Sequence, residues 1–171
     1  MKKLLILGAG GYAQTVADLA RQSGAYDRIG FLDDNTQGAY ILGSCSEFYM
    51  FAGENVDMYP AFGDNETRMY WLGQLEQHNV RIPSLVHSTA YVSPTVRLKP
   101  GTMVLPKAVI NTDCHIGKGC IINCGAIVDH GCVVEEGVHV CLGAIVKAEN
   151  HIPGKMKIEA GQIIEARQFP L

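Results

Sequence analysis

The second half of the chain carries an aliphatic residue at every sixth position, and this repeat constrains the fold more than any other feature. From Val86 to Ile164 each sixth residue is Val, Leu or Ile. The positions are Val86, Val92, Leu98, Val104, Ile110, Ile116, Ile122, Val128, Val134, Val140, Val146, Ile152, Ile158 and Ile164. A period of six belongs to neither an isolated helix nor an isolated strand, and it is typical of hexapeptide repeats in a parallel β-helix. We therefore predict a three-sided prism of four to five coils, with about 18 residues in each coil.

The residues that flank each aliphatic fit the same prism. Two positions earlier stands a mostly small residue, which suits the other inward position of a strand. These residues are Ala90, Val96, Thr102, Ala108, Cys114, Cys120, Ala126, Cys132, Val138 and Ala144. Three positions later glycine is frequent, and glycine accepts the backbone conformation of a tight corner. We expect the three cysteines of the series to act as compact apolar side chains, because no CxxC pair signals a zinc ribbon or a redox motif.

The first part of the chain has an α/β pattern instead. Lys3–Leu7 is a continuous apolar run that predicts a strand, and apolar residues then recur at helical spacing up to Ser23. Arg28–Leu32 predicts a second strand, closed by the polar residues that follow it. Strand, glycine turn, helix and strand therefore follow one another in this segment.

Residues 36–56 show no clear pattern, and residues 56–62 predict a third strand. A helix is expected after it, capped by Asp64 or Asn65. Together these patterns predict an α/β unit over residues 1–82 and a β-helix over residues 83–171.

Two features of the α/β segment point to a nucleotide. Gly8, Gly10 and Gly11 lie between the first strand and the helix, where backbone amides at a helix N-terminus stabilise a phosphate. Asp33 and Asp34 follow the second strand, where a carboxylate commonly meets a ribose or base. The third glycine of the dinucleotide fingerprint is missing, so a plain tight turn is the alternative interpretation.

The composition excludes several classes of protein. The chain has 14 Lys and Arg against 17 Asp and Glu, a formal charge of −3, which argues against a nucleic-acid partner. Its 18% of charged residues lies below the usual quarter, so much of its surface is expected to be covered. We find neither a membrane span nor a cleavable signal, and expect a cytoplasmic protein.

The whole chain resembles the bacterial nucleotide-sugar acetyltransferases of the bacillosamine N-acetyltransferase and sialic acid O-acetyltransferase type. The resemblance implies a Rossmann-like half domain that binds the nucleotide-sugar over residues 1–82. The hexads over about residues 84–165 resemble the left-handed parallel β-helix of hexapeptide acyltransferases. The matching stretches are residues 5–11, residues 31–35, residues 63–65 before Arg68, residues 85–94 and residues 125–130.

The resemblance implies a function and a set of site residues. The function is acetyl transfer from acetyl-CoA to an amino or hydroxyl group of a UDP-linked sugar, in a homotrimer and without a metal. The residues implied for the nucleotide-sugar are Gly8, Gly10, Gly11, Tyr12, Asp33 and Asp34. The catalytic base of the family matches His130, and imidazole suits this role because it titrates near neutral pH. For acetyl-CoA the resemblance implies His139, from an adjacent subunit, and the backbone of Gly143 and Ala144.

Two other interpretations stay open at this stage. The chain has Tyr12 and Gly131 where the family commonly has a histidine and an acid, and it ends soon after the last hexad. A binding or regulatory protein that keeps the fold without the chemistry is therefore possible. His115, His130 and His139 come from nearby coils and suggest a zinc site, but this would leave the α/β segment unexplained.

Overall fold

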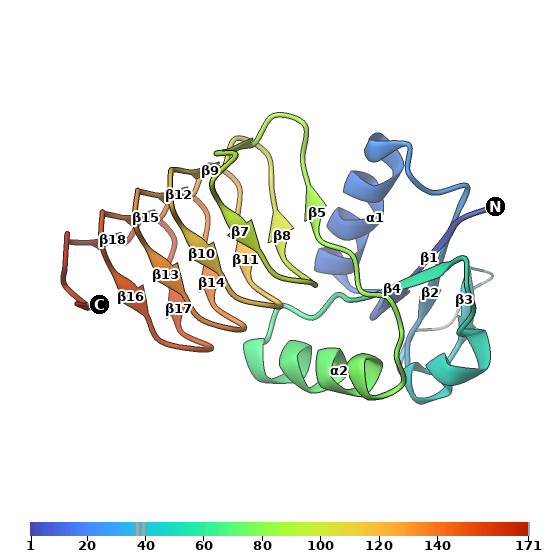
Figure 1. Cartoon of the computed structure of the whole chain (residues 1–171). Helices are drawn as coiled ribbons and strands as arrows, with labels where there is room; N and C mark the ends of the chain where they lie inside the picture. Colours follow the sequence, from blue (N-terminus) through green and yellow to red (C-terminus); the bar gives the residue numbers. More distant parts are fainter. Residues whose placement is uncertain (37, 39, 171) are drawn as a thin grey trace. The chain divides into compact units, whose positions relative to one another are not determined.

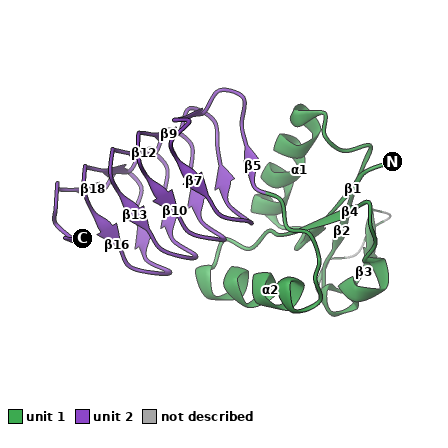
Figure 2. Cartoon of the chain, in the orientation of Figure 1, with its two compact units in different colours: residues 1–83 green, residues 84–171 purple. Residues whose placement is uncertain are grey.

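The computed structural model describes residues 1–36, 38 and 40–170. The chain divides into two compact units, Met1–Pro83 and Ser84–Leu171 (Figure 2). Within the described residues, no helix combines the length and the apolar character that a membrane crossing requires.

The first unit is built on a parallel sheet in the order β3-β2-β1-β4 (Figure 1). Its strands are β1 (Lys3–Leu7), β2 (Arg28–Leu32), β3 (Ile41–Gly43) and β4 (Val56–Pro60). Its helices are α1 (Gly11–Ser23), the 3₁₀ helix η1 (Cys45–Phe51) and α2 (Asn65–Gln77). The segment without a clear sequence pattern thus contains β3 and η1, apart from residues 37 and 39, which lie outside the described residues.

The central strand β1 is buried on both sides, which explains its unbroken apolar run. Leu5 and Leu7 pack in one apolar cluster with Leu72 and Leu75 of α2. The alternate residues of β1 point to the opposite side of the sheet and are also buried, and α1 contacts β1 and β2. Because β1 pairs in parallel with both β2 and β4, the carboxyl ends of these three strands lie at one edge of the sheet.

The second unit winds through three parallel sheets of two-residue strands (Figure 1). The β14 sheet holds β5 (Leu85–Val86), β8 (Met103–Val104), β11 (Ile121–Ile122), β14 (His139–Val140) and β17 (Lys157–Ile158). The β12 sheet holds β6 (Tyr91–Val92), β9 (Val109–Ile110), β12 (Ile127–Val128), β15 (Ile145–Val146) and β18 (Ile163–Ile164). The β13 sheet holds β7 (Arg97–Leu98), β10 (His115–Ile116), β13 (Val133–Val134) and β16 (His151–Ile152). Neighbours in each sheet are 18 residues apart, as the hexads predict.

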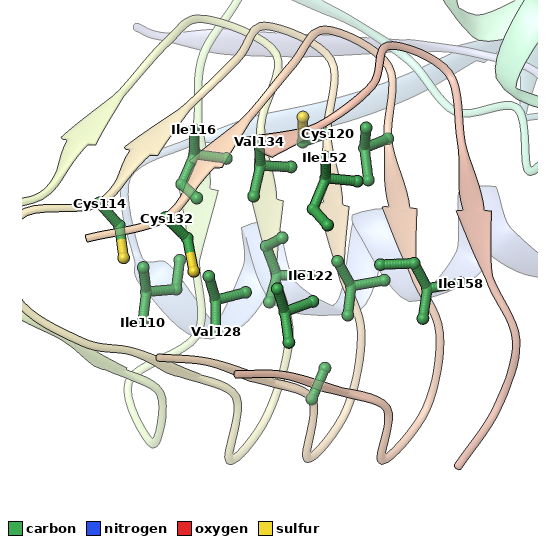
Figure 3. Packing of buried hydrophobic residues seen from close by; sticks show 14 of the residues in the cluster. Ile110, Cys114, Ile116, Cys120, Ile122, Val128, Cys132, Val134, Ile152 and Ile158 are labelled. Carbon is green, nitrogen blue, oxygen red and sulfur yellow. The ribbon is translucent and has the colours of Figure 1, made fainter. Parts of the chain in front are cut away.

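Each hexad aliphatic is the second residue of a strand, and from Val104 onward all of them are buried in one core. Figure 3 shows part of this core. The first coil is less enclosed, since Val86 is 40% exposed and Val92 and Leu98 are partly buried. The small inward series fills the same core, so the predicted use of both inward positions is confirmed.

Polar members of the small series also donate hydrogen bonds, which the sequence did not predict. Thr102 donates to the Gly117 carbonyl at 3.0 Å, and Cys114 and Cys120 donate to the carbonyls 15 residues ahead, both at 3.0 Å. Cys132 and Asn150 repeat the same contact in the later coils. A carbonyl that faces the interior needs such a partner, because an unsatisfied buried acceptor costs about 1–3 kcal/mol.

Candidate active site

In the first unit, three turns meet at the carboxyl edge of the sheet. The glycine turn (residues 8–11) follows β1, the aspartate turn (residues 33–35) follows β2, and the 62–65 loop follows β4. In open α/β sheets, ligands bind in the crevice outside the carboxyl ends of the strands. This edge is therefore the candidate nucleotide site of the unit.

The glycine turn is shaped by close backbone approach. Gly8 has φ of 97° and donates its N–H to the Leu32 carbonyl at 2.7 Å. A β-carbon on Gly8 would lie 3.2 Å from the carbonyl oxygen of Ala61. The N-terminus of α1, capped by Gly10, has neither a side-chain cap nor an acidic residue in its first turn. By contrast, the Asp64 carboxylate caps α2 by accepting the Thr67 N–H, whereas α1 has no such side-chain cap and its first amides are left to a ligand.

Asp33 and Asp34 both accept hydrogen bonds from backbone N–H groups of the first unit. Asp33 accepts the N–H of Ala9 at 2.7 Å through Oδ2, and the N–H groups of Asn35 and Thr36 at 2.9 and 2.6 Å through Oδ1. Burial acts to raise the pKa of Asp33, but these three backbone donors outweigh it and lower the pKa, so Asp33 stays ionised. Asp34 accepts the Cys45 N–H at 2.8 Å and holds the start of η1.

Tyr12, the next residue after the glycine turn, is partly buried and points its hydroxyl at the hydroxyl of Tyr59, at 3.2 Å. Burial raises the pKa of Tyr12 well above the ordinary tyrosine value, and the contact with Tyr59 adds to this. The phenol therefore stays protonated, and its polar atom is engaged inside the unit.

In the second unit, His130 is exposed in the corner turn (residues 129–132) between β12 and β13. Asp129 Oδ1 accepts the His130 N–H at 2.8 Å and the amide of Asn111, one coil away, at 3.1 Å. The His130 carbonyl accepts the N–H of Glu149 in the next coil at 3.0 Å. Neighbouring coils on both sides thus fix the backbone that carries the exposed imidazole.

His139 lies on β14, with its Nε2 3.0 Å from Nδ2 of Asn123. The other amide atom, Oδ1, accepts the Cys124 N–H at 2.8 Å, which fixes the orientation of the amide. Because Nδ2 can only donate, Nε2 must accept, and the proton of the neutral ring is then assigned to Nδ1. His139 therefore presents a defined tautomer.

Gly143 and Ala144 form the corner between β14 and β15. Gly143 is exposed, has φ of 63° and donates its N–H to the Cys124 carbonyl at 3.0 Å. Ala144 is fully buried in the core, and both its N–H and its carbonyl bond within the helix. Of the two, only Gly143 offers surface to a ligand.

His130 and His139 do not come together within one chain. The His130 corner joins the β12 and β13 sheets, whereas His139 belongs to the third sheet. In a three-sided prism, a corner between two sides lies opposite the third side. A site that contains both histidines therefore needs two chains.

Two surfaces near these residues were not assigned to the site by the sequence reasoning. The 62–65 loop adjoins the glycine turn, because the Ala61 N–H bonds to the Leu7 carbonyl and β4 pairs with β1. A groove of about 840 Å³ follows the outer side of the β13 sheet, where Arg97 and His115 stand in one row. The row was readable from the 18-residue spacing. The loop was not, since strand order is invisible in the sequence.

Comparison with known proteins shows what the chain is similar to. The family model of the PglD N-terminal domain matches residues 3–75. The acetyltransferase domain of PglB from Neisseria gonorrhoeae FA1090, solved in complex with acetyl coenzyme A, is 32% identical with a TM-score of 0.93, over 97% of this chain and 83% of that one.

Perosamine N-acetyltransferase from Caulobacter crescentus, solved with CoA and GDP-perosamine, is 23% identical with a TM-score of 0.73, over 97% of this chain and 90% of that one. WeeI from Acinetobacter baumannii AYE is 16% identical with a TM-score of 0.59, over 95% and 88% of the two chains. These two likenesses concern the fold alone. The predicted α/β half domain followed by a left-handed parallel β-helix is confirmed.

Proposed function

The chain belongs to the hexapeptide-repeat nucleotide-sugar acetyltransferases, and from this premise we propose that it moves the acetyl group of acetyl-CoA to an amino or hydroxyl group of a nucleotide-linked sugar. Membership rests on 32% identity with the PglB acetyltransferase domain over nearly the whole chain. The predicted enzyme class, acetyltransferase, is thereby confirmed. The coenzyme, the acceptor and the residue roles are our proposals.

The observation that carries the proposal is the likeness to a domain solved with acetyl coenzyme A. In this chain we assign the coenzyme contact to His139 and Gly143. His139 and Gly143 would touch the acetyl-bearing arm, and buried Ala144 would support the corner from inside. No resident cofactor or metal takes part in this proposal.

The nucleotide part of the acceptor is assigned to the carboxyl edge of the first unit. The first amides of α1 and the glycines at 8, 10 and 11 suit a diphosphate, because a helix N-terminus stabilises an anion. Asp33 shapes the turn, and the edge beside Tyr12 and Asp34 would face the nucleoside. The family resemblance favours UDP, and the complex of perosamine N-acetyltransferase with GDP-perosamine makes GDP the second nucleotide to test.

His130 is assigned as the general base. Its imidazole would accept the proton of the acceptor amine or hydroxyl as that atom bonds to the thioester carbonyl carbon. The carbon–sulfur bond then breaks, and the imidazolium returns the proton to the leaving CoA thiolate. The rigid turn under His130 supports this role, because positioning supplies much of the rate in such transfers.

We further propose a homotrimer with its sites between neighbouring chains. The outward residues of the β12 sheet form an apolar row, in which Tyr91, Ile127 and Ile163 are 54%, 37% and 49% exposed. Such a row is stabilised when a second copy covers it. A neighbour would also bring its own His139 to the His130 corner, which the two positions on one prism do not allow.

Replacement of His130 by alanine tests the proposed chemistry. The purified chain is incubated with acetyl-CoA and a set of UDP- and GDP-linked amino sugars, and thiol release and product mass are measured. The His130→Ala variant is expected to lose at least about a hundredfold in kcat, the lower end of general-base catalysis, while it still binds acetyl-CoA. The matched control His78→Ala alters an exposed histidine of the first unit and should retain full activity. Full activity of His130→Ala would refute the assignment of the base.

A further inference from the structure

Arg68 is the largest side chain that is completely buried in the chain as described, with 0% exposure. It stands in the first turns of α2, where the helix dipole disfavours a cation. A guanidinium in such a place is costly unless its donors are satisfied. Its partners therefore indicate what the residue does.

The guanidinium of Arg68 donates hydrogen bonds to the loop that leads into α2, the helix that carries Arg68. Nη1 donates to the carbonyl of Phe62 at 3.0 Å and to that of Gly63 at 3.3 Å. Nη2 donates to Oδ1 of Asn65 at 2.7 Å. One planar fork thus fixes both ends of the 62–65 loop.

This loop forms one wall of the glycine turn. A β-carbon on Gly8 would contact the Phe62 ring at 3.4 Å as well as the Ala61 carbonyl at 3.2 Å. The Phe62 ring also stacks on Trp71 of α2, with ring centroids 6.3 Å apart. A change in the position of the 62–65 loop must therefore shift the wall against which the glycine turn rests.

The charge of Arg68 also acts on Tyr12, the residue next to the glycine turn. It acts to lower the pKa of Tyr12, against the larger effect of burial, and Tyr12 directly follows Gly11. A neutral donor could satisfy the loop carbonyls equally well. Only a cation adds positive potential beneath a place where a diphosphate is expected.

We propose that Arg68 is a positioning residue of the nucleotide site, which shapes the 62–65 loop through its fork and attracts the diphosphate through its charge. This inference rests on the proposed function of the carboxyl edge. It gives a buried residue a role in the affinity for the nucleotide-sugar and no role in the affinity for acetyl-CoA.

The test separates the fork from the charge in the full-length protein. Arg68→Lys keeps the charge and loses the fork, and Arg68→Gln loses both. Calorimetry with UDP, GDP and acetyl-CoA gives the three affinities, and steady-state assays give KM and kcat for each substrate. The matched control is Arg81→Lys, which removes the Arg81 Nε–H donor from buried Asp57 in the same unit.

We expect nucleoside diphosphate affinity to fall about tenfold in Arg68→Lys and about a hundredfold in Arg68→Gln, as for lost charge-assisted contacts. The KM for the nucleotide-sugar should rise in the same order, with the affinity for acetyl-CoA and kcat within about twofold of wild type. Arg81→Lys should lower the melting temperature and leave all affinities unchanged.

Three outcomes would overturn the inference. If wild type binds neither UDP nor GDP, both the nucleotide site and the role of Arg68 fall. If wild type binds and both Arg68 variants bind equally well, only the role of Arg68 falls. If all affinities drop together with the melting temperature, as with a purely structural residue, the inference is also wrong.

Discussion

Asp33 binds the backbone N–H of Ala9 at 2.7 Å and so ties the turn after β2 to the turn after β1. The same carboxylate closes its own turn through Asn35 and Thr36. The sequence presented the glycines and the aspartate as two separate contributions to a nucleotide site. In the structure they are one hydrogen-bonded element, and the aspartate organises the glycine turn.

The first prediction concerns this carboxylate. Asp33→Asn replaces one accepting oxygen by a donor that must face a backbone N–H, so we expect a loss of about 2 kcal/mol in unfolding free energy. Asp34→Asn is the matched control, because Asp34 accepts one N–H, that of Cys45, and the remaining amide oxygen can keep it. Urea denaturation of both variants measures the difference. Equal losses would contradict the role given to Asp33.

The second prediction is the pH dependence of the same effect. Backbone donors hold the pKa of Asp33 below its ordinary value despite burial, so the folded chain binds the proton less readily than the unfolded chain. The stabilisation is therefore complete above the unfolded pKa of about 3.9 and is lost as the pH falls through the lower folded value. The stability gap between wild type and Asp33→Asn should stay constant from pH 7 to about pH 5 and shrink below about pH 4. A gap that widens toward acid would show that the sign is wrong.

The third prediction tests whether the two histidines of a site come from different chains. His130→Ala and His139→Ala should each be inactive alone. When the two are unfolded together and refolded as mixed trimers, a site is intact if one chain supplies His130 and its neighbour supplies His139. In an equal mixture, about half of the chains carry an intact His130 and about half of their neighbours carry an intact His139. About a quarter of the sites are then complete, so about a quarter of wild-type activity should return.

Mixing two fully folded preparations without exchange of chains is the control for this complementation experiment. It should give no recovery. Absence of recovery in the refolded mixture, with trimers present by sedimentation, would mean that sites do not combine residues of neighbouring chains.

The fourth prediction concerns the close stacking of coils. A β-carbon on Gly117 would lie 2.6 Å from the backbone of Glu135 and Glu136 in the next coil. Because backbone cannot move aside cheaply there, Gly117→Ala should cost about 3 kcal/mol of unfolding free energy. Gly73→Ala, in the interior of α2 with open space around it, should instead stabilise by about 0.5–1 kcal/mol. Thermal denaturation distinguishes the two, and a tolerated Gly117→Ala would contradict the coil spacing.

The β-helix was predictable because every coil repeats the same steric demand. An aliphatic residue at the second strand position points into the core, so the period of the aliphatics from Val104 onward is enough to predict the fold. The same logic fails for residues 36–56, where β3 pairs irregularly with β2 and η1 is a short 3₁₀ helix. A local signal existed there, the capping box of Ser44 and Glu47, which marks the start of η1.

The candidate site was predictable only in part, because its contacts cross between elements. The spacing placed His130 on a corner, as the structure has it, but could not show that Asn111 and Asp129 fix its turn. The importance of Arg68 was hidden as well, since an arginine near a helix start ordinarily points to solvent. Its burial depends on the loop that it holds.

The division of the coil into three sheets has a consequence for changes in chain length. A deletion of six residues from the hexads that precede His130 keeps every aliphatic in phase, so the sequence period would look intact. Yet each later strand would pass to the neighbouring sheet, and the His130 corner would turn by a third of a revolution relative to the coils before it. Before His130, only insertions or deletions of a whole coil preserve the angular position of this corner, so that part of the helix can evolve in length only in steps three times as large as its visible repeat.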